Sequence, residues 1–198
     1  IDAQTGEILS QINKVMHADT PSSSATYFRG TKSITVDSYS GSYRLKDNAR
    51  NIHTKNGSGL DGTVLSTGEL KGATEYTNST ANFTGNATKP AVEVHWGMAK
   101  TYDYYKNIHN RNSYDGQGSI VRNYYNPPSM ISDADNAGAL DGQGIVGMVY
   151  GAGAQYFSPV VALDVAGHEY SHLVVSRNGS GGLNYQGESG ALNESFAD

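Results

Sequence analysis

The chain contains no cysteine, which excludes both a disulfide framework and a zinc site built from thiolates. Positive charge is also scarce, because 14 Lys and Arg residues stand against 19 Asp and Glu residues and give a formal net charge of −5. The basic residues are scattered along the chain, so the electrostatic footprint of a nucleic-acid-binding or membrane-surface protein is missing. We therefore expect neither nucleic acid nor a membrane among its partners.

Long hydrophobic runs are absent as well. Residues 142–163 carry no charged side chain, but five glycines, two glutamines and Pro159 interrupt them. Such a segment is too polar and too broken to span a membrane. It is typical instead of a strand, a glycine loop and the entry to a helix.

The residues that are abundant indicate a loop-rich α+β fold. With 198 residues, the chain has the size of one domain or of one lobe of a larger enzyme. Its 24 glycines and 14 tyrosines favour short strands joined by turns. Residues 1–12 have the signature of a hairpin and residues 18–26 that of a polar linker. The runs between Tyr27 and Thr88 predict a twisted β-meander.

Three helices are expected in the second half of the chain. The first opens at Lys89–Pro90 and runs to about Asn110, since proline suits the first turn of a helix. Its apolar stripe consists of Val92, Trp96, Ala99 and Ile108. Short strands are expected near residues 120–124 and 145–150.

The second helix is expected to run from Val160 to about Arg177. Ser158 would cap it, Pro159 would take its first turn, and Asn178–Gly179 would end it. The third helix begins near Glu188.

The most informative motif, HEYSH at His168–His172, lies in the middle of the second helix. Positions i and i+4 share one helix face, so both imidazoles can reach one ion, while Glu169 lies beside it. This arrangement suits a hydrolytic zinc site with two nitrogen ligands, an open coordination position and an adjacent base.

A zinc site needs a further ligand, and two sequence patterns can be compared for it. The metzincin pattern requires Gly at position 175 and His at position 178, where this chain has Val175 and Asn178. The third ligand should therefore be a distant glutamate. Glu194 lies 22 positions after His172, on a helix that a glycine-rich loop can fold back.

Several stretches together point to one family. They are HEYSH itself, GLNYQGESGALNESFAD at residues 182–198, and weaker matches at residues 102–107, 113–116 and 148–151. In these stretches the chain resembles the thermolysin family of secreted neutral zinc metallopeptidases (gluzincins). The resemblance is diffuse before residue 90 and specific from residue 160 onward. It implies a β-rich N-terminal catalytic lobe at residues 21–158 and zinc-binding helices at residues 159–198.

The resemblance also implies the roles of individual residues. His168, His172 and Glu194 would bind Zn²⁺, and Glu169 would polarise the attacking water and pass its proton to the leaving amine. The other implied roles are hydrogen-bond partners of the imidazoles (Asp198, Asn193), substrate-binding residues (Asn136, Ala137, Tyr185) and a possible calcium ligand (Asp164).

For the whole protein, the resemblance implies a secreted zinc-dependent endopeptidase that is made as a zymogen. Its partners would be polypeptide substrates and its own propeptide, which would act as inhibitor and chaperone. Residues 1–20 would be the C-terminal remnant of that propeptide and a linker. Ca²⁺ would be bound in the full-length protein. The family's C-terminal helical lobe, with the histidine that stabilises the oxyanion, would be absent, so we expect this chain alone to be weakly active or inactive.

The chain departs from the family in places, and alternatives remain open. Gly138–Ala139 replaces a bulky aromatic pair, and no Asp-rich loop occurs between residues 60 and 88. The alternative function is a non-catalytic Tyr/Asn/Gly-rich binding module with a structural metal site. Tyr185 could be a core residue and Asn136 a turn residue. The remaining histidines are expected to be structural (His95) or at the surface (His17, His53, His109).

Overall fold

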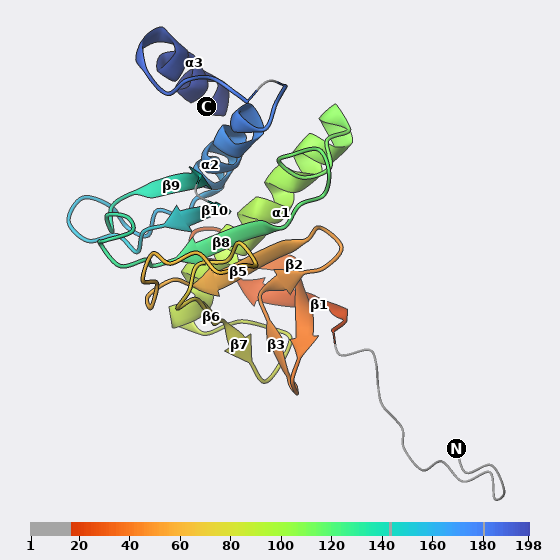
Figure 1. Cartoon of the computed structure of the whole chain (residues 1–198). Coiled ribbons are helices and arrows are strands. Elements are labelled where there is room, and N and C mark those ends of the chain that lie inside the picture. The colour runs from red at the N-terminus through yellow and green to blue at the C-terminus, as the bar shows by residue number, and fades with distance from the viewer. Residues whose placement is uncertain (1–16, 143, 180) are drawn as a thin grey trace, which may run out of the picture.

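The structure, a computed structural model, describes residues 17–142, 144–179 and 181–198 and has a mixed α+β fold (Figure 1). The predicted fold class is confirmed. The predicted hairpin at residues 1–12 and most of the predicted propeptide remnant lie outside the described residues. The strands are β1 (Asp19–Ala25), β2 (Thr31–Tyr39), β3 (Ser42–Arg44), β4 (Lys46–Asp47), β5 (Ile52–Asn56), β6 (Thr74–Glu75), β7 (Thr77–Asn78), β8 (Val121–Tyr125), β9 (Ala137–Gly142) and β10 (Ile145–Tyr150). The helices are the short 3₁₀ helix η1 (Asn86–Thr88), α1 (Lys89–His109), α2 (Leu163–Ser176) and α3 (Gly187–Ala197).

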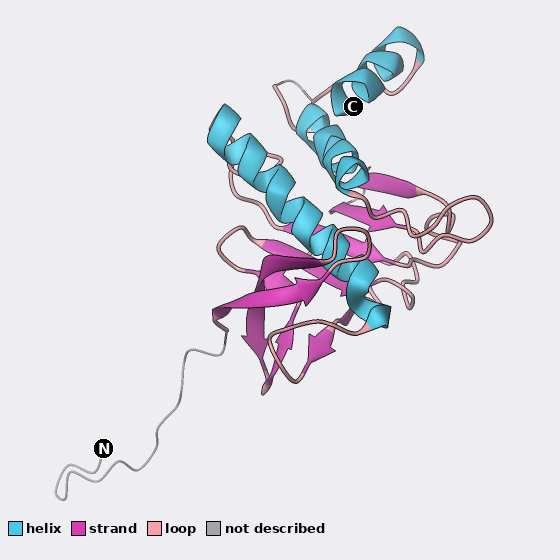
Figure 2. Ribbon diagram, turned by 180° about the vertical axis from the view of Figure 1, so that it is seen from behind, coloured by secondary structure: helices cyan, strands magenta, loops and turns pink. Residues whose placement is uncertain are grey.

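The strands form two sheets. One has the order β1-β2-β3-β7, and the other has the order β4-β5-β8-β10-β9 with β6 paired to β5. The predicted single β-meander is therefore wrong, since the strands between residues 27 and 88 are divided between the two sheets. Figure 2 shows α1 crossing the sheets with α2 beside it, while α3 packs on α2.

The predicted linker at residues 18–26 is in fact strand β1. It pairs antiparallel with β2 over all seven of its residues. Its serines can be buried because their hydroxyl groups find partners: Ser22 and Ser24 share a hydrogen bond of 2.6 Å, and the Phe83 N–H donates to Ser24 Oγ. A polar sequence can thus form an edge strand with buried positions when its side chains are satisfied locally.

Helix α1 confirms the first predicted helix. Val92, Val94 and Met98 are fully buried against the sheets. At Gly97, a Cβ atom would lie 3.2 Å from the Ala166 side chain, so glycine lets α1 and α2 approach closely. Ile108 was predicted in the buried stripe but is 66% exposed, because the last turn of α1 projects past the sheets (Figure 1).

Helix α2 begins at Leu163, three residues later than predicted. The residues before it stay extended, since the Val160 N–H donates to Gly151 O at 3.0 Å. Ser158 is therefore not the cap; that position belongs to Ala162, which makes no side-chain cap. The predicted third helix and the two predicted strands correspond to α3, β8 and β10. Strand β9 was not predicted from the sequence pattern, and the family resemblance implied only an edge-strand pair at Asn136 and Ala137.

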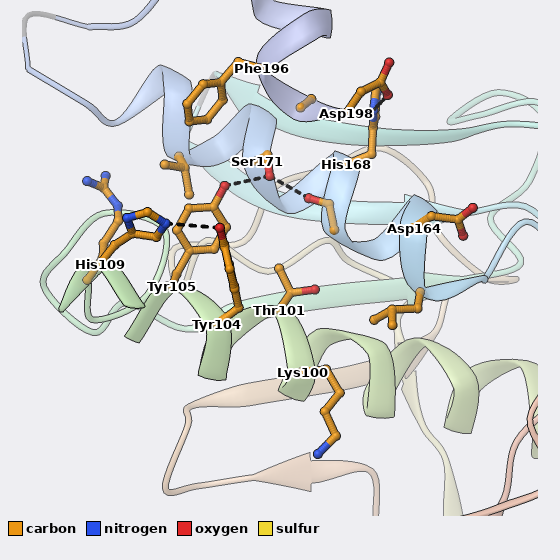
Figure 3. A pocket seen from close by; sticks show the side chains of 15 residues that line it. Lys100, Thr101, Tyr104, Tyr105, His109, Asp164, His168, Ser171, Phe196 and Asp198 are labelled. Atoms are coloured by element: carbon orange, nitrogen blue, oxygen red, sulfur yellow. Dashed lines mark hydrogen bonds and ion pairs between the residues drawn. The ribbon is translucent and has the colours of Figure 1, made fainter. Parts of the chain in front are cut away.

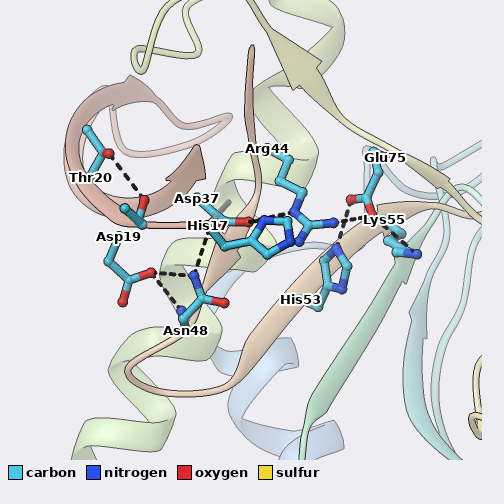
Figure 4. Close-up of polar contacts among 10 residues, drawn as sticks. His17, Asp19, Thr20, Asp37, Arg44, Asn48, His53, Lys55 and Glu75 are labelled. Carbon is cyan, nitrogen blue, oxygen red and sulfur yellow. Dashed lines mark hydrogen bonds and ion pairs between the residues drawn. The ribbon is translucent and has the colours of Figure 1, made fainter. Parts of the chain in front are cut away.

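A network of charged side chains links the two sheets (Figure 4). Arg44 Nε lies 2.8 Å from Asp37, and its Nη1 lies 3.0 Å from Glu75. His53, predicted at the surface, is only 8% exposed, because its Nε2 bonds to Glu75 at 2.8 Å. Burial lowers the pKa of His53. Burial alone would raise the pKa of Glu75, but the His53 hydrogen bond and the charges of His53, Lys55 and Arg44 bring it to about 2.

The other histidines outside the metal motif follow their predictions. His95 is buried and structural: its Nε2 bonds to Thr35 O at 2.9 Å and its Nδ1 to Thr54 Oγ1 at 3.0 Å. His17 and His109 are exposed. None of the described helices combines the length and the apolar character that a membrane crossing would require.

Candidate metal centre

Helix α2 is held firmly on the side away from the histidine pair. This buried side consists of Ala166, Tyr170 and Leu173. The Tyr105 hydroxyl of α1 donates to Ser171 Oγ at 2.7 Å, and Ser171 Oγ donates to Gly167 O at 2.8 Å (Figure 3). The position of the HEYSH turn is therefore fixed by α1 and by the core.

His168, His172 and Glu194 converge at one point. The two Nε2 atoms are 3.0 Å apart, and the Glu194 carboxylate lies 3.2 Å from His168 Nε2 and 3.6 Å from His172 Nε2. In the described part of the chain, they form the only group of three or more His, Cys, Asp or Glu side chains whose ligand atoms come close enough to share a metal ion. The structure thus brings together the three predicted zinc ligands, while their role stays a prediction.

The neighbours of the two imidazoles define their tautomers. His168 Nδ1 donates to Asp198 Oδ1 at 2.9 Å, and His172 Nδ1 donates to Asn193 Oδ1 at 2.7 Å. With the proton on Nδ1, each neutral ring directs the lone pair of Nε2 at the other ring and at Glu194. Such converging acceptors repel one another unless a cation lies between them.

The spacing of these atoms fits zinc. Zn–N and Zn–O bonds of ~2.0–2.1 Å at tetrahedral angles place neighbouring ligand atoms about 3.3 Å apart. The observed separations of 3.0, 3.2 and 3.6 Å lie around this value. Two nitrogens and one carboxylate also leave one tetrahedral position open, which is typical of catalytic rather than structural zinc.

Glu169 points to a different side of α2 and is 7% exposed. Burial raises the pKa of its carboxyl group, and the nearby His168 and His172 oppose that rise. A carboxylate with a raised pKa accepts and returns a proton more readily near neutral pH. The backbone N–H of Ala139 interacts with the same carboxylate and connects it to strand β9.

Strand β9 forms the edge of its sheet, beside the convergence point. Asn136 directly precedes β9 and Ala137 begins it. The Gly151 N–H donates to Asn136 O at 2.8 Å, so the Asn136 carbonyl is already used within the sheet. Ala137 and the exposed Asn136 side chain remain available to a peptide, as predicted for this pair.

A cleft of about 630 Å³ lies between β9 and helices α2 and α3. Leu183 and Tyr185 also line it. Tyr185 is 63% exposed, and its ring centroid lies 6.0 Å from that of His172, so it is not a core residue. Its predicted contact with substrate is therefore sterically open.

Two contacts, one before strand β9 and one within it, were missed at the sequence level. Asp135 accepts four backbone N–H groups, from residues 154–157, at 2.6–3.2 Å. These donors, Gln155 first, lower its pKa to about 2. Asp141 binds the C-terminal end of α2 through Ser176 and Arg177. Neither contact has a local signal, because the partners lie 19 to 36 positions away.

Asp164 occupies the first turn of α2, at one end of a groove of about 850 Å³ between α1 and α2 (Figure 3). Its side chain is exposed. Within the described ranges, it joins no group of three ligating side chains that could hold a metal. Its predicted part in calcium binding thus gains no support from this arrangement.

Comparisons with known proteins find metallopeptidases among the relatives of this chain. The family model for the catalytic domain of thermolysin metallopeptidases matches residues 22–176. Bacillolysin from Bacillus amyloliquefaciens is 34% identical over 206 residues, covering all of this chain and 36% of that protein. Extracellular elastase from Staphylococcus epidermidis is 32% identical over 202 residues, with coverages of 100% and 37%.

A thermostable neutral protease from Geobacillus stearothermophilus is 37% identical over 166 residues, covering 83% of this chain and 28% of that protein. The chain therefore spans about a third of the length of the curated relatives it matches. Among solved structures, the precursor of protealysin from Serratia proteamaculans aligns with a TM-score of 0.49 and 21% identity, covering 97% of this chain and 44% of that one.

Proposed function

The chain belongs to the thermolysin metallopeptidase family, and on this basis we propose that it forms the zinc-binding part of a secreted endopeptidase. The observation that carries the proposal is the convergence of two imidazole lone pairs and one carboxylate, with the buried Glu169 beside them. A structural metal site has no use for such an acid. The alternative of a non-catalytic binding module is not favoured by the relatives, which are proteases by name.

The residues divide the chemical work among them. His168, His172 and Glu194 would hold Zn²⁺, which when bound supplies a Lewis acid for a peptide carbonyl. Asp198 and Asn193 keep both imidazoles in the tautomer that presents Nε2. Glu169 takes a proton from a water in the cleft and returns it to the leaving amine. Ala137, Asn136 and Tyr185 hold the peptide against the open edge of β9.

Three further parts of the proposal rest on the family alone. The protein is secreted, as the name of the staphylococcal elastase indicates for that relative. Its propeptide inhibits it and assists its folding, and residues 1–20 include the end of that propeptide. Calcium is bound at a site to which Asp164 contributes.

Zinc stoichiometry tests the central step. We expect about one Zn²⁺ per chain by elemental analysis after dialysis, and a loss of that zinc in His168→Ala. His109→Ala is the matched control, because His109 is an exposed histidine outside the cluster. Zinc that persists in His168→Ala, or zinc that also disappears in His109→Ala, would contradict the assignment.

A further inference from the structure

The register of strand β9 identifies which of its backbone groups face outward. The hydrogen bond from Gly151 N–H to Asn136 O shows that residues 136 and 151 form a hydrogen-bonded pair. Hydrogen-bonded and non-hydrogen-bonded pairs alternate along an antiparallel ladder. The pairs 137–150, 139–148 and 141–146 are therefore non-hydrogen-bonded pairs. Ala137, Ala139 and Asp141 accordingly direct their N–H and C=O groups away from β10, toward the open edge.

The metal centre lies at only one end of this row. His168 and Glu169 line a smaller pocket, of about 270 Å³, together with Asn136 and Ala137. Asp141 instead contacts Ser176, which lies four residues after His172 and eight after His168 on α2, hence ~6–12 Å further along the helix. In an extended peptide, this distance corresponds to about two to four residues.

The far end of the row is fixed by side-chain contacts. Asp141 Oδ2 accepts a hydrogen bond from Ser176 Oγ at 2.5 Å, and Asp141 Oδ1 forms an ion pair with Arg177. Before Met148, β10 pairs only with β9, and without these contacts this two-stranded tip, which contains Gly142 and Gly147, would be poorly ordered. The contacts therefore hold Asp141 in line with the rest of β9, at the C-terminal end of α2.

We propose that Asp141 positions an additional binding site for an extended polypeptide, about two to four residues on the N-terminal side of the bond that is cut. A peptide that pairs antiparallel with β9 has its N-terminal residues near Asp141 and its C-terminal residues near Asn136. The inference rests on the proposed function for the position of the cut bond. The pairing itself depends only on the edge of β9.

Equilibrium binding to the zinc-loaded chain tests the proposal. The probes are fluorescently labelled peptides with a reduced, uncleavable central bond and one, two or four residues on its N-terminal side. Extension from two to four residues should tighten the Kd by about 3- to 10-fold. N-methylation of successive peptide amides should weaken binding at every second position, because only alternate N–H groups of a paired strand face β9.

Variants separate the roles of Asp141. Asp141→Pro removes the outward N–H group and the side-chain contacts, yet leaves pairing with β10 intact, since that N–H does not bond to β10. We expect this variant to bind the peptides with two and with four N-terminal residues equally well, so that extension no longer tightens the Kd. Asp141→Ala should reduce the gain from extension, and Asp141→Asn should largely restore it through its remaining acceptor oxygen. Asp133→Ala, in the exposed loop before β9, is the matched control and should keep the full gain.

The outcomes distinguish this inference from the proposed function. A gain that survives in Asp141→Pro with an unchanged melting temperature would overturn the inference, as would N-methyl effects without a two-residue period. Absence of any peptide binding would overturn it too. If the peptide series behaves as expected but the chain binds no zinc, the binding site on β9 is supported and the proposed hydrolytic function is contradicted.

Discussion

Two clusters among the described residues combine histidine with carboxylate side chains, and only one of them suits a metal. The first contains His53, Glu75 and Asp37 and includes the cations Arg44 and Lys55. The second, His168, His172, Glu194 and Asp198, has no Lys or Arg within ion-pair distance among the described residues. The counter-charge, rather than the residue type, distinguishes a structural network from a metal centre.

The clusters also differ in how their acceptors are used. In the first, each carboxylate already receives hydrogen bonds from a cation or an imidazole. In the second, the Nδ1 atoms are bonded, and both Nε2 atoms face each other and Glu194. The first cluster is therefore satisfied as it stands, whereas the second would be completed by the cation that we propose.

The largest expected effect comes from Glu169→Gln. Removal of a general base typically costs about 10²- to 10⁴-fold in rate. The test requires a preparation whose wild type cleaves casein. In that preparation, Glu169→Gln should lower kcat by this factor and leave the zinc stoichiometry unchanged. Glu75→Gln, the same exchange in the other cluster, should leave kcat unaltered at a temperature where it stays folded. Hydrolysis that survives Glu169→Gln would overturn the assignment of the base.

The next largest effect concerns stability. Arg44→Met leaves the buried Asp37 and part of Glu75 without their cation, and breaking a buried ion pair in this way costs about 3–5 kcal/mol. Denaturant titration should show this loss. Zinc stoichiometry of the folded variant should not change. Lys71→Met, in an exposed pair with Asp61, is the control and should have far less effect, because solvent screens this pair.

The sequence allowed the residues of the second cluster to be predicted, but not those of the first. His168, Glu169 and His172 could be predicted because one helical turn brings them together, and Glu194 because it lies on the next helix. His53 was misplaced because its burial depends on Arg44 and on Glu75, which is 22 positions away. A local sequence pattern carries no trace of such partners.

The edges of the site were predicted less well for the same reason. Strand β9 contains Gly138 and two alanines, which have weak strand propensity, and pairing with β10 overrides it. The start of α2 was misplaced because Val160 bonds to Gly151 instead of entering the helix. In both cases a long-range backbone contact outweighed local preference.

Acid should weaken the first cluster in two steps. The pKa of His53 is lower in the folded chain than in the unfolded chain. As the pH falls below ~6.5, the unfolded chain therefore takes up this proton first, and the stability that is present above this pH is lost. The pKa of Glu75 is about 2 in the folded chain, against an ordinary value of 4.5. Glu75 therefore contributes stability above pH 4.5, and this contribution is lost as the pH falls from 4.5 to 2. That second loss is on the order of 2–3 kcal/mol.

The measurement for this step is the difference in unfolding free energy between wild type and Glu75→Gln as a function of pH. It should shrink from pH 5 to pH 2, because protonation makes the two side chains alike. A difference that stays constant over this range would show that Glu75 is not held as an anion by its neighbours.

The smallest effect is expected at the buried neighbour of His172. Asn193→Ala removes the acceptor that holds the Nδ1 proton, and losses of such partners typically weaken metal binding by about 10- to 100-fold. Asp198→Ala should lie at the lower end of that range, because the Asp198 side chain is 79% exposed and water can replace it. Zinc affinity measured by competition with a chelator checks both, with Asn184→Ala, an exposed asparagine nearby, as the control. Equal affinities in Asn193→Ala and wild type would mean that His172 is oriented by the packing of α2 alone, and the distinction between the two clusters would then rest on charge rather than on orientation.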